Sequence, residues 1–209
     1  MRSSLLDVSP DVEVRISLIE LPDRVGRAES RRRLLEILAA ELGVEPGVVR
    51  LTAAPGGKPI LDPRAGLPDL RFSVAHSANR QLVAVCDASE VGVDIEQHRL
   101  RARIDGLARR AMSEAELDAW RAVADPAERA QRFYDLWTRK EAYVKGLGTG
   151  LVTDLATVEL EPASRKPRTW RVARRDQDPS WWIAELEVGA GWSAAVACER
   201  GPIRVSTRG

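Results

Sequence analysis

The sequence predicts an α+β fold made of two similar α/β lobes in tandem, related by pseudo-twofold symmetry, with an active site at the lobe interface. Alternating apolar and polar residues indicate strands with one buried face, and amphipathic stretches without Gly or Pro indicate helices. A faint internal repeat relates residues 82–87 (LVAVCD) to residues 194–199 (AAVACE). We place the N-terminal lobe at residues 1–90 and the C-terminal lobe at residues 91–209, with a polar, loosely held tail from about residue 201.

The composition excludes several classes of protein. The chain has 209 residues, of which 44% are hydrophobic, and its formal net charge of +1 gives no general attraction for nucleic acid. No apolar run is long enough to span a membrane, and Asp7 interrupts the N-terminus too early for a signal peptide. Cys86 and Cys198 lie in apolar runs without metal-ligand spacing, so we expect buried free thiols in a reducing cytoplasm.

The predicted N-terminal lobe contains one helix and several short strands. The helix covers residues 28–42, with leucines on one face and Gly43 at its end. A turn at residues 55–59 (PGGKP) carries Lys58, and His76 closes a strand. Both are candidates for phosphate binding, although a solvated lysine and a structural histidine are the ordinary interpretations. Strands are predicted at residues 12–19, 48–51, 70–76 and 81–86.

The predicted C-terminal lobe begins with a strand at residues 91–96 and continues through a basic segment into two helices. Ser113 and Glu116 can form a capping box at the first helix. The second helix runs from about residue 127 to residue 147, and we expect Gly146 to stop it. The basic segment contains Arg99, Arg101, Arg103, Arg109 and Arg110. Later strands are predicted at residues 156–160, 170–172, 181–186 and 193–198, and loops at residues 161–166 and 174–180.

The strand at residues 91–96 (VGVDIE) carries two carboxylates on one face. Side chains alternate along a strand, so Asp94 and Glu96 project together, away from the buried face. Two neighbouring carboxylates repel each other, and a cation offsets that cost. Hard oxygen ligands with no His or Cys nearby favour Mg²⁺ over zinc. An edge strand with both acids in water is the alternative.

The segment at residues 137–145 (WTRKEAYVK) places an aromatic ring, a carboxylate and an ammonium group in one row. Residues four apart share a helix face, so Trp137, Glu141 and Lys145 align. Taken alone, the Glu–Lys pair is typical of a solvated surface. Together with Asp94 and Glu96 at the seam between the lobes, Glu141 would complete a three-carboxylate magnesium site. Lys145 would then face the same ligand, and a diphosphate suits that set.

These two motifs resemble the paired signature of the 4′-phosphopantetheinyl transferases. The pattern is GVDIE at residues 92–96, followed about forty residues later by WTxKEAxxK at residues 137–145. The chain length, the GKP at residues 57–59 and the strand from Phe72 to His76 are similar to the Sfp-type, two-lobed monomeric branch, over about residues 24 to 199. The resemblance implies transfer of the phosphopantetheine arm of coenzyme A to a serine of an acyl or peptidyl carrier protein, with release of adenosine 3′,5′-bisphosphate.

The resemblance also implies roles for individual residues. Asp94, Glu96 and Glu141 would hold Mg²⁺, Glu141 would be the general base for the carrier serine, and Lys145 would assist the leaving group. The lysines that grip the 3′-phosphate in some relatives have no clear match here, because the segment before the first helix is short. We expect Arg24, Arg27 or Arg31 to substitute for them. The residues implied to contact coenzyme A are Lys58, Ala75 through its backbone, His76, Lys140, Lys145 and Arg27. The implied partners are a carrier protein and coenzyme A, without nucleic acid or membrane.

Two departures from the family pattern stand out. Ala75 occupies a position where serine is common, which removes one hydroxyl contact to coenzyme A, and Ala111–Met112 replaces a more usual aromatic pair. Two other functions are the alternatives, and the first of them uses the same carboxylates. One is a magnesium-dependent phosphodiesterase or nucleotide hydrolase that activates water. The other is a non-catalytic module that docks carrier proteins.

Overall fold

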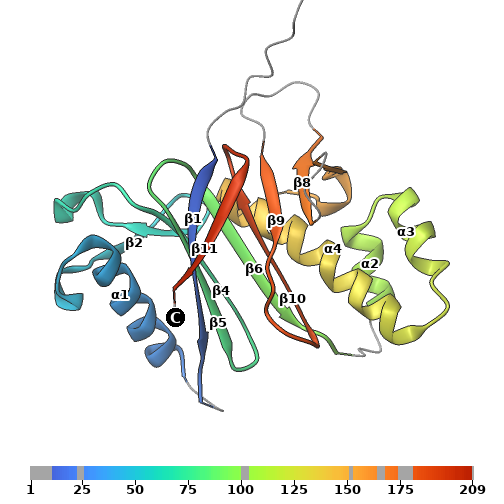
Figure 1. Ribbon diagram of the computed structural model, residues 1–209, viewed down its shortest axis with the longest axis horizontal. Helices are drawn as coiled ribbons and strands as arrows, with labels where there is room; N and C mark the ends of the chain where they lie inside the picture. The colour runs from blue at the N-terminus through green and yellow to red at the C-terminus, as the bar shows by residue number, and fades with distance from the viewer. Residues whose placement is uncertain are drawn as a thin grey trace, which may run out of the picture.

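The computed structural model describes residues 11–22, 26–99, 104–150, 153–163, 168–173 and 181–208, which form a mixed α+β fold (Figure 1). This confirms the predicted class, while the pseudo-twofold symmetry and the lobe boundary stay predictions. The helices are α1 (Arg27–Leu42), α2 (Ile104–Ala111), α3 (Glu114–Arg121) and α4 (Pro126–Leu147). The strands are β1 (Val12–Glu20), β2 (Leu51–Ala53), β3 (Pro59–Leu61), β4 (Arg71–Ser77), β5 (Arg80–Cys86), β6 (Val91–Gln97), β7 (Leu160–Pro162), β8 (Thr169–Val172), β9 (Trp182–Glu185), β10 (Trp192–Cys198) and β11 (Ile203–Arg208).

Two main sheets occupy the centre of the molecule. Their strand orders are β11-β1-β5-β4 and β6-β10-β9-β8-β7, and β2 and β3 form a separate hairpin. Figure 1 shows α1 beside the first sheet and α4 running along the second. None of the described helices is long and apolar enough to cross a membrane.

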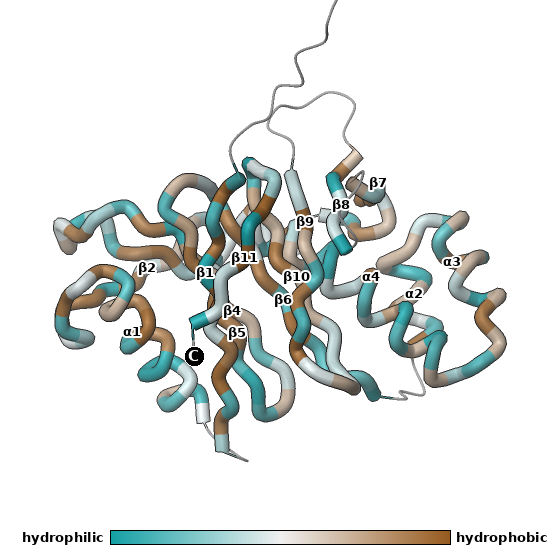
Figure 2. Tube along the Cα trace, viewed as in Figure 1, coloured by the Kyte–Doolittle hydropathy of each residue, from teal (hydrophilic) through white to brown (hydrophobic). Residues whose placement is uncertain are grey.

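Alternation of side chains along the central strands divides the core into layers. On β5, Leu82 lies in a core shared by both sheets, whereas its neighbour Val83 packs with residues of α1. On β10, Val196 lies in the shared core, whereas Ala195 packs with residues of α4. Figure 2 shows the corresponding hydrophobic stretches along the central strands. Both faces of these strands are therefore covered, which explains their nearly continuous apolar sequences. Cys86 and Cys198 are buried and free, as predicted.

The predicted loose tail is instead a strand. Residues Ile203–Arg208 form β11, which pairs in parallel with β1 from Val12 opposite Ile203 to Ser17 opposite Arg208. Arg208 also forms an ion pair at 2.8 Å with Glu41 of α1, whose side chain is only 3% exposed. The tail looked loose because its residues are polar, but one solvated face is compatible with an edge strand.

The structure confirms the predicted end of α4 at Leu147 but not the glycine that was expected to stop it. Gly146 does not stop the helix, which continues to Leu147 and ends at Gly148 in a left-handed conformation (φ 68°). Gly146 serves a different purpose, because a Cβ at this position would overlap the indole ring of Trp181. The helix before β2 behaves as expected, since α1 ends at Leu42 with Gly43 left-handed (φ 65°).

Two short predicted strands are shifted toward the C-terminus. Residues 46–48 and 155–157 form single 3₁₀ turns, and the strands β2 and β7 begin a few residues later. Pro46 starts the first turn, and the Asp154 side chain accepts a hydrogen bond from Ala156 N at 3.0 Å in the second. The predicted capping box of Ser113 and Glu116 is present at the start of α3. Arg101, Arg103 and residues 164–167 and 174–180 lie outside the described residues.

Candidate active site

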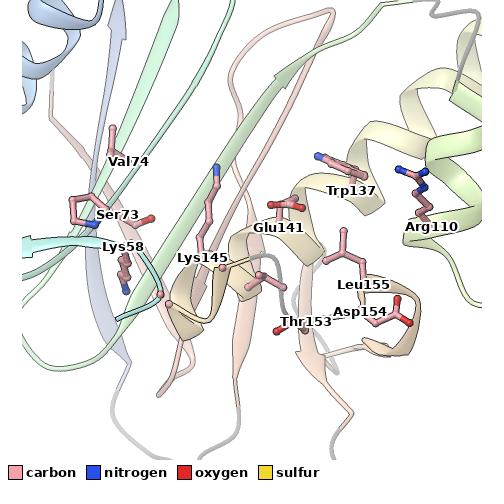
Figure 3. A pocket seen from close by; sticks show the side chains of 16 residues that line it. Lys58, Ser73, Val74, Arg110, Trp137, Glu141, Lys145, Thr153, Asp154 and Leu155 are labelled. Carbon is pink, nitrogen blue, oxygen red and sulfur yellow. The ribbon is translucent and has the colours of Figure 1, made fainter. Parts of the chain in front are cut away.

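A cavity of about 610 Å³ opens at the seam between the two sheets, and both predicted lobes line it (Figure 3). Trp137, Glu141 and Lys145 all face it from α4, which confirms that these residues share one side of the helix. The other walls come from the glycine turn before β3, from β4, from α2 and from the segment after α4. They comprise Gly56, Gly57, Lys58, Pro59, Ser73, Val74, Arg110, Val144, Gly148, Gly150, Thr153, Asp154 and Leu155.

Close contact between β6 and α4 brings Asp94 to this seam. A Cβ on Gly92 would overlap the Ala142 carbonyl oxygen and the Gly146 nitrogen, so the absence of a side chain allows the helix to lie against the strand. Asp94 faces the helix and is 5% exposed. Its Oδ1 accepts a hydrogen bond from Lys145 Nζ at 2.6 Å. Its Oδ2 is buried without a hydrogen-bond partner among the described residues.

Burial and mutual repulsion change the acidity of the carboxyl groups at the seam. Burial raises the pKa of Asp94 to about 7; the Lys145 ammonium opposes this rise, and the charges of Glu96 and Glu141 add to it. Burial also raises the pKa of Glu141. The positive charge of Lys145 opposes this rise, and the negative charge of Glu96 adds to it. The three carboxyl groups therefore lie close enough to influence one another's charge, as expected for residues that share one cation.

The carboxylate oxygens of Asp94, Glu96 and Glu141 are of the type that binds a hard divalent cation. Among the described residues, however, no three His, Cys, Asp or Glu side chains are arranged as a metal site. The Lys145 ammonium forms an ion pair with one oxygen of Asp94 and so partly neutralises this carboxylate, as a bound cation would. The unpartnered Oδ2 of the same carboxylate is the open oxygen of the set. Buried oxygen atoms of this kind are the ligands that Mg²⁺ prefers.

Lys58 fastens the glycine turn to both sides of the seam. Its ammonium donates to Glu90 Oε2 at 2.8 Å, to the Val91 carbonyl at 3.0 Å and to the Gly146 carbonyl at 3.1 Å. A Cβ on Gly56 would overlap the carbonyl oxygen of Gly148, so the turn lies directly against the end of α4. Lys58 therefore lines the cavity with its stem while its charge holds three segments together.

The structure corrects the expectation that Lys140 contacts coenzyme A. Its side chain is fully buried, and its ammonium donates to Glu116 Oε2 at 2.6 Å, the Ala111 carbonyl at 2.9 Å and the Leu155 carbonyl at 3.1 Å. Lys140 faces α2 and α3 and is not among the residues that line the cavity. Its position in the helix thus supports packing of the helices, since a buried ammonium needs such partners.

Three other residues implied by the resemblance lie outside the cavity wall. Ala75 is 2% exposed in the shared core, and His76 is exposed near the end of β4. Arg27 is the exposed first residue of α1. None of these described residues lines the cavity. Arg24 lies outside the described residues.

Two serines of β4 escape the sequence analysis although they lie at the seam. The hydroxyl of Ser73 accepts a hydrogen bond from Val93 N at 3.1 Å, and the hydroxyl of Ser77 donates to Glu96 Oε2 at 2.9 Å. Their spacing of four residues, which puts both hydroxyl groups on one face of the strand, is the signal that could have drawn attention to them. Arg110, noted only as part of a basic segment, also lines the cavity.

Comparison with known proteins identifies the family. Residues 90–197 match the family model described as the 4′-phosphopantetheinyl transferase superfamily. The chain is 32% identical to the 4′-phosphopantetheinyl transferase HetI of Nostoc sp., over 91% of this chain and 78% of that protein. It is 28% identical to a putative 4′-phosphopantetheinyl transferase of Synechocystis sp. (78% and 74% covered) and 26% identical to the 4′-phosphopantetheinyl transferase Sfp of Bacillus subtilis (77% and 67% covered).

The matched region contains both the strand that carries Asp94 and the helix that carries Glu141 and Lys145. It therefore includes most of the groups that meet at the seam, and the likeness to HetI extends over nearly the whole chain. The chain belongs to the 4′-phosphopantetheinyl transferase superfamily and is a transferase.

Proposed function

We propose that this chain transfers the 4′-phosphopantetheine arm of coenzyme A to a serine of an acyl or peptidyl carrier protein, with Mg²⁺ as cofactor. The observation that carries the proposal is that Asp94 pairs with Lys145 of α4 and feels the charges of Glu96 and Glu141, while Glu141 and Lys145 line the cavity. The names of the relatives state the transferase activity. The carrier protein, the metal and the residue roles are our inference.

In this proposal Asp94, Glu96 and Glu141 are the residues that would hold Mg²⁺ beside the diphosphate of coenzyme A. The ion would neutralise charge on the phosphate oxygens, a contribution typical of phosphoryl transfer. Asp94 would offer its unpartnered Oδ2 to the ion, while Lys145 pairs with Oδ1 at 2.6 Å. Because its side chain is 34% exposed, the lysine can turn toward the phosphate groups and stay in the cavity.

Glu141 is the proposed general base. The carrier serine hydroxyl attacks the phosphorus that bears the pantetheine, its proton passes to Glu141, and the bond from that phosphorus to the adenosine bisphosphate breaks. Lys145 neutralises the negative charge on the departing phosphate. In the metal-free protein, burial raises the pKa of Glu141. The products are the modified carrier and adenosine 3′,5′-bisphosphate.

Other residues are assigned to binding. Lys58 holds the glycine turn in place as one wall for coenzyme A, and the exposed His76 and Arg27 would meet its outer phosphate groups. The backbone of Ala75 has the same proposed role through the resemblance alone. Arg110 lines the end of the cavity beyond Trp137 and, with Arg99 and Arg109, gives an acidic carrier a basic surface.

One chain supplies all the groups of this site, which supports a monomer as the active form. The buried free thiols Cys86 and Cys198 are in keeping with a cytoplasmic location, which we also propose.

The substitution Glu141→Gln tests the proposal. We expect it to lower the rate of carrier modification at least about 100-fold, because the amide cannot accept the serine proton. The rate is measured by intact mass spectrometry of an apo carrier protein incubated with coenzyme A and Mg²⁺. Glu128→Gln is the matched control, since Glu128 lies on the first turn of the same helix, half exposed and paired with Arg132. Equal rates for both variants would refute the role of Glu141.

A further inference from the structure

The two main sheets meet at the edges of β4 and β6. β4 pairs with β5 in the first sheet and β6 pairs with β10 in the second, so neither strand continues the ladder of the other. Buried backbone N–H groups at such an edge need other hydrogen-bond acceptors. Side chains of β4 in the first sheet can therefore accept hydrogen bonds from the backbone N–H groups of β6 in the second sheet.

Two serine hydroxyls supply these acceptors. Ser73 Oγ accepts from Val93 N at 3.1 Å, and Ser77 Oγ accepts from Gln97 N at 3.2 Å. The serines are four residues apart on β4, and their partners are four residues apart on β6, so both bonds fix the same register between the strands. A strand repeats its side-chain direction every second residue, which places both serines on one face of β4.

Ser77 makes a second bond that Ser73 lacks. Its hydroxyl donates to Glu96 Oε2 at 2.9 Å while it accepts from Gln97 N. Within the described part of the chain, Ser73 Oγ has no carboxylate partner. A hydroxyl has one proton to donate, so the bond accepted from Gln97 directs the proton of Ser77 toward Glu96. One oxygen of this carboxylate is consequently fixed relative to the first sheet.

We propose that Ser77 is a positioning residue that orients the Glu96 carboxylate for Mg²⁺ and connects this ligand to the first sheet. The inference rests on the proposed function, because it gives Glu96 a metal to bind. A hydrogen-bonded carboxylate loses less rotational freedom on binding an ion, and partners of this kind set the geometry of metal ligands. Ser77 does not touch the substrate in this account, and it acts through Glu96.

The test is the affinity of the protein for Mg²⁺, measured by calorimetric titration in the presence of coenzyme A, with a blank titration of Mg²⁺ into coenzyme A. We expect Ser77→Ala to raise the apparent Kd for Mg²⁺ about 10-fold or more, the range typical of lost partners of metal ligands. Ser77→Thr keeps the hydroxyl and should bind with nearly wild-type affinity.

Ser73→Ala is the matched control, because it removes the other serine bond across the seam and leaves Glu96 untouched. Its melting temperature should fall by an amount similar to that of Ser77→Ala, with an apparent Kd for Mg²⁺ close to wild type. If Ser77→Ala does not fold, Ser77→Cys replaces it, since a thiol has nearly the same size and is a weak donor. Unchanged Mg²⁺ affinity in the folded Ser77 variant, or an equal loss in Ser73→Ala, would overturn the inference.

The same titrations separate this inference from the proposed function. If the wild-type protein binds coenzyme A without any effect of Mg²⁺, the proposed metal site is wrong and Ser77 has no ligand to orient. If wild type responds to Mg²⁺ and Ser77→Ala responds identically, the metal site stands and the role of Ser77 alone is refuted.

Discussion

Asp94 is the residue on which the site depends most. Its carboxylate is buried, one oxygen is paired with Lys145 and the other has no hydrogen-bond partner among the described residues. When this carboxylate is ionised it destabilises the metal-free protein, because the free energy lost on desolvation exceeds the attraction to the single ammonium group of Lys145. Buried carboxylates with a raised pKa, like that of Asp94, are common in functional sites.

This arrangement predicts how stability depends on pH. Asp94 has a pKa of about 7 in the folded protein, whereas an aspartate in an unfolded chain has a pKa of about 3.9. The folded state holds the proton more tightly, so the stabilisation from the protonated form is complete below pH 4 and is lost as pH rises through about 7. Removing the carboxylate should remove this contribution.

We therefore expect the melting temperature of metal-free wild type to fall relative to that of Asp94→Asn between pH 5 and pH 8. The relative change should be at least about 3 °C for a chain of this size. Thermal unfolding in the presence of EDTA measures it, and titrating groups far from Asp94 cancel in the comparison. Parallel curves for the two proteins would show that Asp94 is not strained by burial.

The sequence predicted that Glu141 and Lys145 share one side of α4, and both do line the cavity, because helix periodicity determines which side chains share a face. Sequence reasoning assigned Lys140 wrongly, since the motif contains two lysines and their partners come from distant segments. Lys140 donates to the carbonyl groups of Ala111 and Leu155, which lie far from it in the sequence, so no local pattern could have shown that it is buried. Ser77 was missed for the same reason, because its bond to Glu96 joins two strands that are not paired.

At the scale of elements, contact between α4 and β6 determines the geometry of the site. Gly92 on the strand and Gly146 on the helix allow the two backbones to approach, and Trp181 covers the helical glycine. Sequence reasoning placed the helix correctly but interpreted Gly146 as its end, because glycine most often has that role. The need for close approach becomes evident only when the partner strand is known.

Gly92→Ala should therefore loosen this contact. The added methyl group would overlap the Ala142 carbonyl and the Gly146 nitrogen, both parts of a rigid helix backbone, so we expect a loss of about 1–3 kcal/mol in the free energy of unfolding. Gly106→Ala in α2 is the control, because its new Cβ meets nothing within 4 Å and alanine favours helix. Urea titration gives both values, and a neutral Gly92→Ala would contradict the account.

At the scale of the whole molecule, the cavity lies at the seam between the two sheets. The central strands β5, β6 and β10 were predicted closely, since both of their faces are buried and their sequences are nearly continuous apolar runs. The strand at residues 203–208 was not predicted, because a polar strand at the edge of a sheet has the same composition as a loose tail. β11 returns to β1 and thereby joins the C-terminal end of the chain to the first sheet.

The central claim is that carboxylates from β6 and α4 hold Mg²⁺ at this seam so that the diphosphate of coenzyme A reacts with a carrier serine. Intact mass spectrometry of a panel of apo carrier proteins, incubated with the enzyme and coenzyme A in either Mg²⁺ or EDTA, tests it most directly. The account predicts that the mass of phosphopantetheine appears on a carrier in Mg²⁺ and not in EDTA, with coenzyme A intact when the carrier is omitted. Modification in EDTA, or cleavage of coenzyme A without any carrier, would contradict it.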